Sequence, residues 1–309
     1  RYGIFGILIL PHVEFIIPRG FNTDMDDEKV LVVAFDGMDK ELIEKFDLEN
    51  IKQEEYGSID NSTGISRRMT SELFASFITG ETYEKHGVEG LETDVGLWDR
   101  FVDYIIPSWL ERNFRGIYTL KNWLRRGEAF ESRKFTKSDL DVDSIFEEID
   151  ASLPLYVPSY NPDPTWLLGY PHQIVRYYDT AEWVENTEWH TKARLRHGIG
   201  SQPAFFDISK GFWDIVMLHL HDPDSFQDTK LGDLEEQYNR LDRIAGEILE
   251  EFENWTVIFM SDHGRPLEKS GPHDHNENAF YSSNEPLFDQ EPHITDFHDK
   301  IIDMVEKGS

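Results

Sequence analysis

Three short apolar segments of this chain are each followed by an aspartate, and these aspartates are the first candidates for chemistry. They are Asp36 after residues 30–34, Asp224 after residues 213–220, and Asp262, with His263 beside it, after residues 255–260. Apolar runs of this length favour buried strands of a parallel sheet over helices. Because parallel strands end at one edge of a sheet, we expect the three carboxylates to lie close together. Carboxylates crowded in this way stay ionised only beside cations, so the pattern predicts a site for divalent metal ions.

Histidine and hydroxyl side chains add to this group. His273 and His275 follow the third segment after a short loop, and Thr70 and Ser71 open a predicted helix that ends at Gly80. We expect Thr70 or Ser71 to be the N-cap of this helix, whose first N–H groups and dipole favour an anion. Oxygen and nitrogen ligands without sulfur suit Zn²⁺, Mn²⁺ or Fe. Two such ions, about 3.5–4 Å apart, form a clamp for phosphoryl transfer.

The segments that must position these residues alternate between strands and helices. Such alternation predicts an α/β fold with a mostly parallel central sheet and helices on both faces. We interpret residues 1–309 as a single domain of this kind. Residues 161–205 are rich in Trp, Tyr, His and charge without a strand pattern, so we predict a helical insertion that caps the sheet. A structural alternative for Asp36 is that it caps the helix predicted at residues 40–46.

The net charge of −30, from 60 acidic and 30 basic residues, restricts the classes of partner. Such a surface repels phosphates, so we expect no role in coating nucleic acid and little attraction to anionic membranes. Acidic residues spread over the whole chain are typical of a protein kept in solution at high salt, where self-repulsion is screened. A halophilic, haloarchaeal source is therefore our hypothesis.

The chain has no cysteine, which excludes disulfides, thiolate ligands and a cysteine nucleophile. The apolar stretches at residues 2–10 and 13–17 are shorter than the ~20 residues that span a membrane, so we expect them to pack on the core. The first residue is Arg1, which indicates a processed or trimmed chain. We favour the cytoplasm of a halophile as the location, with secretion as the alternative. The sequence does not indicate an oligomeric state.

The motifs together resemble the alkaline phosphatase superfamily, in particular its type I phosphodiesterase/nucleotide pyrophosphatase branch. The matching segments, in family order, are FDGMD at 35–39, MTSELFASFITG at 69–80, HG at 86–87, HDPDSFQD at 221–228, SDHG at 261–264 and HDHNENAFYS at 273–282. The resemblance implies a hydrolase of small phosphoric esters that works through a covalent phospho-threonine. It also implies two divalent metal ions, with Zn²⁺ or Mn²⁺ favoured and Mg²⁺ or Ca²⁺ as alternatives.

The resemblance further implies roles for individual residues. The family spacing back from the Thr-Gly that closes the helix makes Thr70 the nucleophile. The implied metal ligands are Asp36, Thr70, Asp262 and His263 in one subsite, and Asp224, Asp228 and His275 (or His273) in the other. The candidate substrate contacts are Asn61, Arg67 and Arg68. We expect His86, His219 and His221 to support the structure or the ligands instead of binding metal.

The sequence departs from the family pattern at two positions. Asp228 stands where the family usually has His, which favours Mn²⁺, Mg²⁺ or Ca²⁺ in that subsite or leaves it weakly filled. Glu72 stands where Pro is common two residues after the nucleophile. Its charge suits the helix dipole but repels an anionic substrate, and Arg67 and Arg68 could offset this by binding a phosphate oxygen.

Other functions occur on the same fold. A sulfatase needs a Cys or Ser in a C/S-x-P-x-R segment, and residues 62–66 do not match it. A phosphomutase normally carries a large inserted domain, and residues 165–200 are short for one. A third alternative is a degenerate member that keeps the fold and one metal without catalysis, and Asp228 is the feature that supports it.

Overall fold

The computed structural model describes residues 28–90, 134–161, 211–221, 223–224, 227, 233–267 and 275–308. The strands are β1 (Val30–Phe35), β2 (Glu55–Ser58), β3 (Ser152–Leu155), β4 (Ile215–Leu220), β5 (Thr256–Ser261) and β6 (Phe280–Ser283). The helices are α1 (Lys40–Phe46), α2 (Glu49–Lys52), α3 (Thr70–Thr79), α4 (Tyr83–His86), η1 (Lys137–Asp139), α8 (Ile145–Glu148), α14 (Leu234–Glu251) and α15 (Asp296–Gly308).

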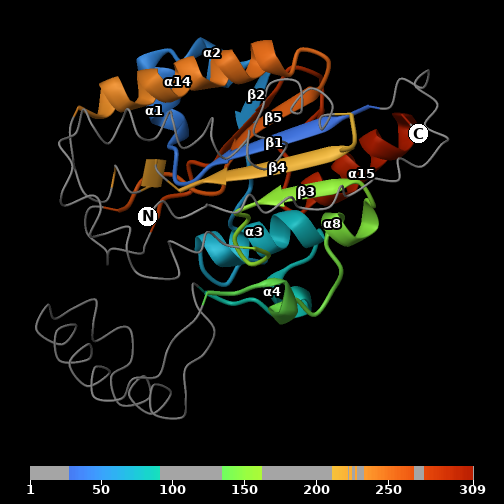
Figure 1. Cartoon of the computed structure of the whole chain (residues 1–309). Helices are drawn as coiled ribbons and strands as arrows, with labels where there is room; N and C mark the ends of the chain where they lie inside the picture. Colours follow the sequence, from blue (N-terminus) through green and yellow to red (C-terminus); the bar gives the residue numbers. More distant parts are fainter. Residues whose placement is uncertain are drawn as a thin grey trace, which may run out of the picture.

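A six-stranded sheet in the order β2-β6-β5-β1-β4-β3 is the centre of the described structure (Figure 1). Strand β1 is parallel to both β4 and β5, and β3 is parallel to β4. Strand β6 is antiparallel to β5 and to β2. The mostly parallel sheet confirms the predicted α/β fold. The antiparallel edge was not predicted, because a short strand carries no signal for its direction in the sheet.

Helices cover both faces of the sheet (Figure 1). The odd-numbered residues of β1 lie in a core shared with α1, α2 and α14. The even-numbered residues lie in a second core shared with α3, α8 and α15. Because both faces are covered, β1, β4 and β5 are buried along their whole length, which explains their largely apolar sequences.

The register of the sheet brings the ends of the three central strands level. Phe35, the last residue of β1, pairs with Leu220. Asp36 follows β1 and donates its backbone N–H to the Leu220 carbonyl at 3.0 Å. Ala34 pairs with Met260, so Asp262 follows its strand at the same edge. Gly37 then turns the chain with φ of +68°, a conformation that glycine adopts without a steric penalty.

The structure excludes the alternative role of Asp36 as a helix cap, and the expected cap of the helix at residues 70–79 is wrong. Asp36 does not cap α1: the N-cap is Asp39, whose side chain accepts from Glu41 N at 2.9 Å. Neither Thr70 nor Ser71 caps α3: the N-cap is Met69, without a side-chain cap bond, and Thr70 is the first helical residue. The reason is that the Thr70 hydroxyl faces other side chains instead of the backbone of its own helix.

Several predicted features lie outside the described residues. They are the apolar N-terminal stretches, Asp228, His273 and the insertion at 161–205 apart from Asn161. No helix in the described part of the chain combines the length and the apolar character needed to cross a membrane.

Candidate active site

Asp36 is fully buried at the centre of the candidate site. Its Oδ1 lies 3.3 Å from Thr70 Oγ1 and 3.4 Å from His263 Nε2. Its Oδ2 lies 2.6 Å from His221 Nδ1 and 3.3 Å from His219 Nε2. Burial opposes ionisation, but the hydrogen bonds and charges of His219 and His221 outweigh it and hold the pKa of Asp36 well below its usual range. The two oxygens of this carboxylate therefore face two different sets of side chains.

Asp262 supplies a second buried carboxylate. Its Oδ1 accepts from Gly37 N at 3.4 Å, whereas its Oδ2 is buried with no hydrogen-bond partner among the described residues and lies 3.5 Å from His263 Nε2. Burial, followed by the negative charge of Asp36, raises the pKa of Asp262 well above its usual range. A buried carboxylate oxygen without a donor, beside an imidazole nitrogen, fits a cation.

His263 presents a lone pair to this group. Its Nδ1 lies 2.9 Å from the Gly264 carbonyl oxygen, which can only accept, so Nδ1 carries the proton. In the neutral imidazole with this tautomer Nε2 carries the lone pair, and it lies 3.3 Å from Thr70 Oγ1. A histidine whose other nitrogen donates to a backbone carbonyl is the usual form of a metal ligand.

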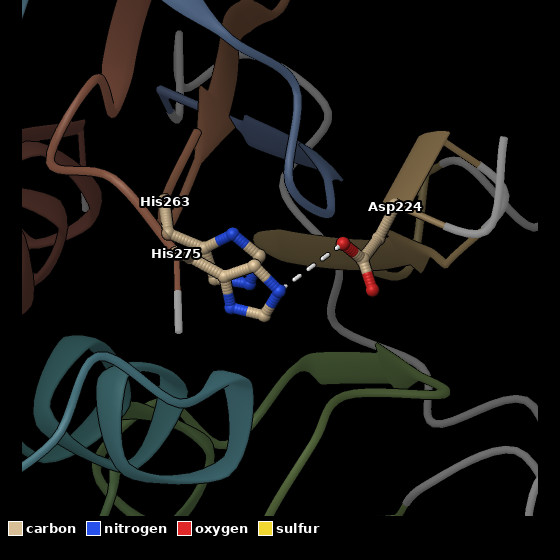
Figure 2. A group of neighbouring side chains, drawn as sticks. All are labelled: Asp224, His263 and His275. Carbon is tan, nitrogen blue, oxygen red and sulfur yellow. Dashed lines mark ion pairs between the residues drawn. The ribbon is translucent and has the colours of Figure 1, made fainter. Parts of the chain in front are cut away.

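Asp224 and His275 form the neighbouring part of the site (Figure 2). His275 Nε2 lies 3.6 Å from Asp224 Oδ1, and both side chains are buried. The rings of His275 and His263 stack with their centroids 3.8 Å apart and an interplanar angle of 1°. The two imidazoles lie face to face, and the dashed line in Figure 2 joins His275 to Asp224 at the side of this stack.

The described residues contain three groups whose ligand atoms lie within 4.8 Å of one another. They are Asp36, Asp262 and His263; Asp224, His263 and His275; and Asp36, His221 and Asp224. The structure thus brings together the predicted ligands that it describes. His221 was not among the predicted ligands, yet it lies in one of these groups. Its position directly after β4 and beside the end of β1 could have indicated this from the sequence.

The candidate substrate contacts lie around this group. Asn61 is buried, and its Nδ2 donates to the Asp262 carbonyl at 2.7 Å, so it orients the loop that carries a predicted ligand. Arg68 is paired with Glu277 at 3.2 Å, and the Arg67 side chain is exposed. Contact of these three residues with a substrate stays a prediction.

Glu72 has a structural role that the sequence did not reveal. Its carboxylate is fully buried and accepts from Ser66 Oγ at 2.8 Å, from Arg67 N at 3.3 Å and from Gly90 N at 3.2 Å. These bonds fix the segment before α3, which carries both arginines, against the first turn of the helix.

Buried oxygen and nitrogen donors around a hydroxyl at a helix N-terminus are typical of metal-dependent hydrolases of phosphoric esters. The family model for type I phosphodiesterase/nucleotide pyrophosphatase matches residues 30–269, most of the chain. The chain belongs to this family and is a hydrolase acting on phosphoric ester bonds.

Solved structures with a similar fold include two alkaline phosphatases and one nucleotide pyrophosphatase. The alkaline phosphatase from the Antarctic bacterium TAB5 is 12% identical, covers 91% of this chain and 98% of its own, and has a TM-score of 0.43. Alkaline phosphatase PafA is 11% identical, with 78% and 63% covered and a TM-score of 0.46. Murine ectonucleotide pyrophosphatase/phosphodiesterase 5 is 14% identical, with 77% and 57% covered and a TM-score of 0.37. No curated protein matches the chain.

Proposed function

We propose that this protein hydrolyses a small phosphoric ester through a covalent phospho-threonine at Thr70. The observation that carries the proposal is the position of Thr70 Oγ1, 3.3 Å from both Asp36 Oδ1 and His263 Nε2. A hydroxyl becomes an effective nucleophile when a neighbouring group accepts its proton or a metal lowers its pKa. Thr70 is also the first residue of α3, where the helix dipole favours an anionic phosphate.

Two divalent ions belong to this proposal. The residues that would hold one are Asp36, Thr70, Asp262 and His263, and the residues that would hold the other include Asp224, His275 and Asp228. Zn²⁺ or Mn²⁺ are the favoured ions for these donors, with Mg²⁺ or Ca²⁺ as alternatives. Such ions, when bound, neutralise phosphate charge and lower the pKa of an oxygen nucleophile.

The chain itself positions the reacting hydroxyl. Thr70 is 4% exposed, so its side chain is largely shielded from bulk water. Asp36 and His263 fix the direction of its Oγ1, and the Gly264 carbonyl fixes the tautomer of His263. A nucleophile oriented before the substrate arrives loses less entropy in the attack on phosphorus.

Two arginines are the proposed contacts of the phosphate. Arg67 is exposed beside the start of α3, and a substrate oxygen would compete with Glu277 for Arg68. Asn61 remains a candidate contact, although its amide already donates to Asp262. The net charge of −30 supports use at high salt in the cytoplasm of a halophile and disfavours nucleic acid as a partner.

The test measures turnover of bis-p-nitrophenyl phosphate in molar KCl with Zn²⁺, Mn²⁺ or Mg²⁺. We expect turnover by the wild type and its loss in Thr70→Ala. The matched control is Thr79→Ala, at the other end of α3: the two threonines are 4% and 5% exposed, but Thr79 Oγ1 donates to the Ala75 carbonyl at 2.7 Å, away from the site. The control should keep its turnover.

Three outcomes would contradict the proposal. Turnover by Thr70→Ala at the wild-type rate excludes the phospho-threonine. No turnover with any of the three ions, together with one bound metal or none, supports the degenerate member of the fold instead. Transfer of phosphate between two positions of one substrate, without release, would identify a phosphomutase.

A further inference from the structure

We propose that Ser159 is a positioning residue of the reaction, because its hydroxyl holds the first turn of α3 in place. Ser159 Oγ donates to the Ser71 carbonyl at 2.7 Å, and Ser159 is 1% exposed. Ser71 follows Thr70 directly, so this bond reaches the residue next to the proposed nucleophile. The inference rests on the proposed function, because it concerns the same hydroxyl of Thr70.

Ser159 belongs to the segment at residues 156–161, which follows the carboxyl end of β3. Strand β3 is parallel to β4, and β4 is parallel to β1, so the segment begins at the edge of the sheet that carries Asp36. The two serines are 88 residues apart in sequence. The Ser159 bond therefore joins the edge with the candidate ligands to the start of the helix with the nucleophile.

The backbone of Ser159 is in the left-handed region, with φ of +61°. An L-residue rarely adopts this conformation, because its Cβ lies too close to the following carbonyl oxygen. The described ranges contain four non-glycine residues with a positive φ, and Ser159 is the only buried one among them. A conformation of this kind persists only where the surrounding structure holds it, and such residues concentrate at functional sites.

Hydrogen bonds on both sides of Ser159 hold this conformation. Asn161 Oδ1 accepts the backbone N–H of Val157 at 2.9 Å, and Asn161 Nδ2 donates to the Pro154 carbonyl at 2.8 Å. The Tyr160 carbonyl accepts the backbone N–H of the first residue of η1 at 2.9 Å. The segment is therefore fixed to β3 and to η1, and it presents the Ser159 hydroxyl to α3 from a fixed support.

The contacts of Thr70 depend on the position of this first turn. Its Oγ1 lies 3.3 Å from both Asp36 Oδ1 and His263 Nε2, which is long for hydrogen bonds. A shift of α3 away from the sheet would lengthen both distances. Misplacement of a reacting group by about 1 Å can cost about 100-fold in rate. We therefore expect the Ser159 hydroxyl to affect the rate of attack and not the binding of substrate.

Ser152 provides a matched control at the other end of β3. Its hydroxyl also donates to a backbone carbonyl, that of Phe146 at 3.1 Å, and this bond joins β3 to α8. Ser152 is the first residue of the strand, whereas Ser159 follows its carboxyl end. If the Ser159 bond only stabilised the fold, the alanine variants of both serines would lower stability and leave the catalytic rate unchanged.

The first experiment measures kcat and KM for bis-p-nitrophenyl phosphate, together with the midpoint of urea unfolding. Ser159→Ala removes the hydroxyl and keeps the strained φ, whereas Ser159→Gly removes the hydroxyl and adopts this φ without a steric penalty. We expect kcat to fall by roughly 10- to 100-fold in both variants with little change in KM. The urea midpoint of Ser159→Gly should lie above that of Ser159→Ala, and Ser152→Ala should keep the wild-type kcat.

The second experiment requires no turnover. The backbone N–H groups of residues 73–75 bond back to residues 69–71 in the first turn of α3, as Leu73 N does to the Met69 carbonyl at 3.0 Å. Their hydrogen exchange therefore measures how firmly this turn is held. We expect faster exchange at residues 73–75 in both Ser159 variants and unchanged exchange in Ser152→Ala.

Three results would overturn the inference and leave the proposed function intact. They are a wild-type kcat in either Ser159 variant, a fall of kcat in Ser152→Ala as large as in Ser159→Ala, and unchanged exchange at residues 73–75 in the Ser159 variants. Absence of turnover in the wild type would instead contradict the proposed function, while the exchange rates would still decide whether Ser159 holds α3.

Discussion

Asp39 joins the two histidine-bearing segments of the site to the end of β1. It is fully buried, and its Oδ1 accepts from Glu41 N at 2.9 Å as the cap of α1. Its Oδ2 accepts from Arg265 N at 3.2 Å and from Asn276 Nδ2 at 2.8 Å. These donors are two residues after His263 and one residue after His275.

The perturbation to test is Asp39→Ala. Loss of the cap costs about 1 kcal/mol. The partly buried amide of Asn276 is left without this acceptor, which costs about 1–3 kcal/mol. The ion pair with Arg265 adds little, because that side chain is 43% exposed and regains water. We therefore expect the free energy of unfolding to fall by about 3 kcal/mol.

Metal affinity should fall as well. The segments around residues 264–266 and 275–276 also contact each other through Gly264 N to the Asn276 carbonyl at 3.2 Å and Asn276 N to the Arg265 carbonyl at 3.1 Å. Asp39 holds this pair of segments against β1, so its loss lets both imidazoles move. Loss of an outer contact of this kind costs about 10–100-fold in metal affinity.

The assay combines urea unfolding with calorimetric titration of Mn²⁺. The control is Glu41→Ala, which removes another partner of Arg265 at 2.7 Å but is 63% exposed, and it should stay within about 0.5 kcal/mol of the wild type. Equal stability of Asp39→Ala and Glu41→Ala would refute the reasoning about burial. Lower stability with unchanged metal affinity would refute the positioning of the histidines.

Three further predictions follow from charge, backbone conformation and burial. A Cβ on Gly37 would lie 2.8 Å from Asp224 Oδ1, so Gly37→Ala should weaken metal binding. The control Gly90→Ala has a similar φ of +80° and nothing within 4 Å of the added Cβ, so it should only lower stability. Equal metal affinities of the two variants would contradict this prediction. Burial lowers the pKa of His86 from 6.5 to about 4, so the unfolded state takes up the proton first as the pH drops. The free energy of unfolding should therefore fall between pH 6.5 and about 4. In urea unfolding at several pH values, His86→Gln should reduce this dependence on pH. The net charge of −30 predicts that the midpoint of urea unfolding rises between about 0.1 M and about 2 M KCl. The halophilic hypothesis would be excluded if the protein were fully folded in low salt and lost stability in molar KCl.

The central strands and their acidic ends could be predicted because burial on both faces leaves a strong signal. The run at residues 30–34 became β1 with one more residue, and the carboxylates of Asp36 and Asp262 followed at one edge, as a parallel sheet requires. The direction of β6 could not be predicted in this way, since an edge strand of four residues has the same composition in either direction. The ligand groups were predictable to the extent that they follow strands.

Residues that hold the candidate ligands in place left a weaker signal. Asp39 and Asp36 are both aspartates between β1 and α1, and composition does not distinguish the cap from the candidate ligand. The difference arises from Gly37, whose left-handed φ turns the chain so that the two side chains point to different neighbours. The role of Thr70 could not be read from composition either, because its hydroxyl faces Asp36 instead of capping its own helix.

Glu72 shows why a charge in a sequence does not establish an electrostatic role. In the first turn of α3 its charge was expected to act on the helix dipole and on the substrate, yet its carboxylate is buried and accepts hydrogen bonds from Ser66, Arg67 and Gly90. A carboxylate that accepts several hydrogen bonds from one loop holds that loop in a single conformation, because each released donor would be left unsatisfied. Proline restricts the backbone at its own position and at the residue before it, whereas Glu72 fixes the segment before α3 and with it the place of Arg67 relative to Thr70. The departure from the family pattern therefore replaces a local constraint with one that reaches the predicted phosphate contacts.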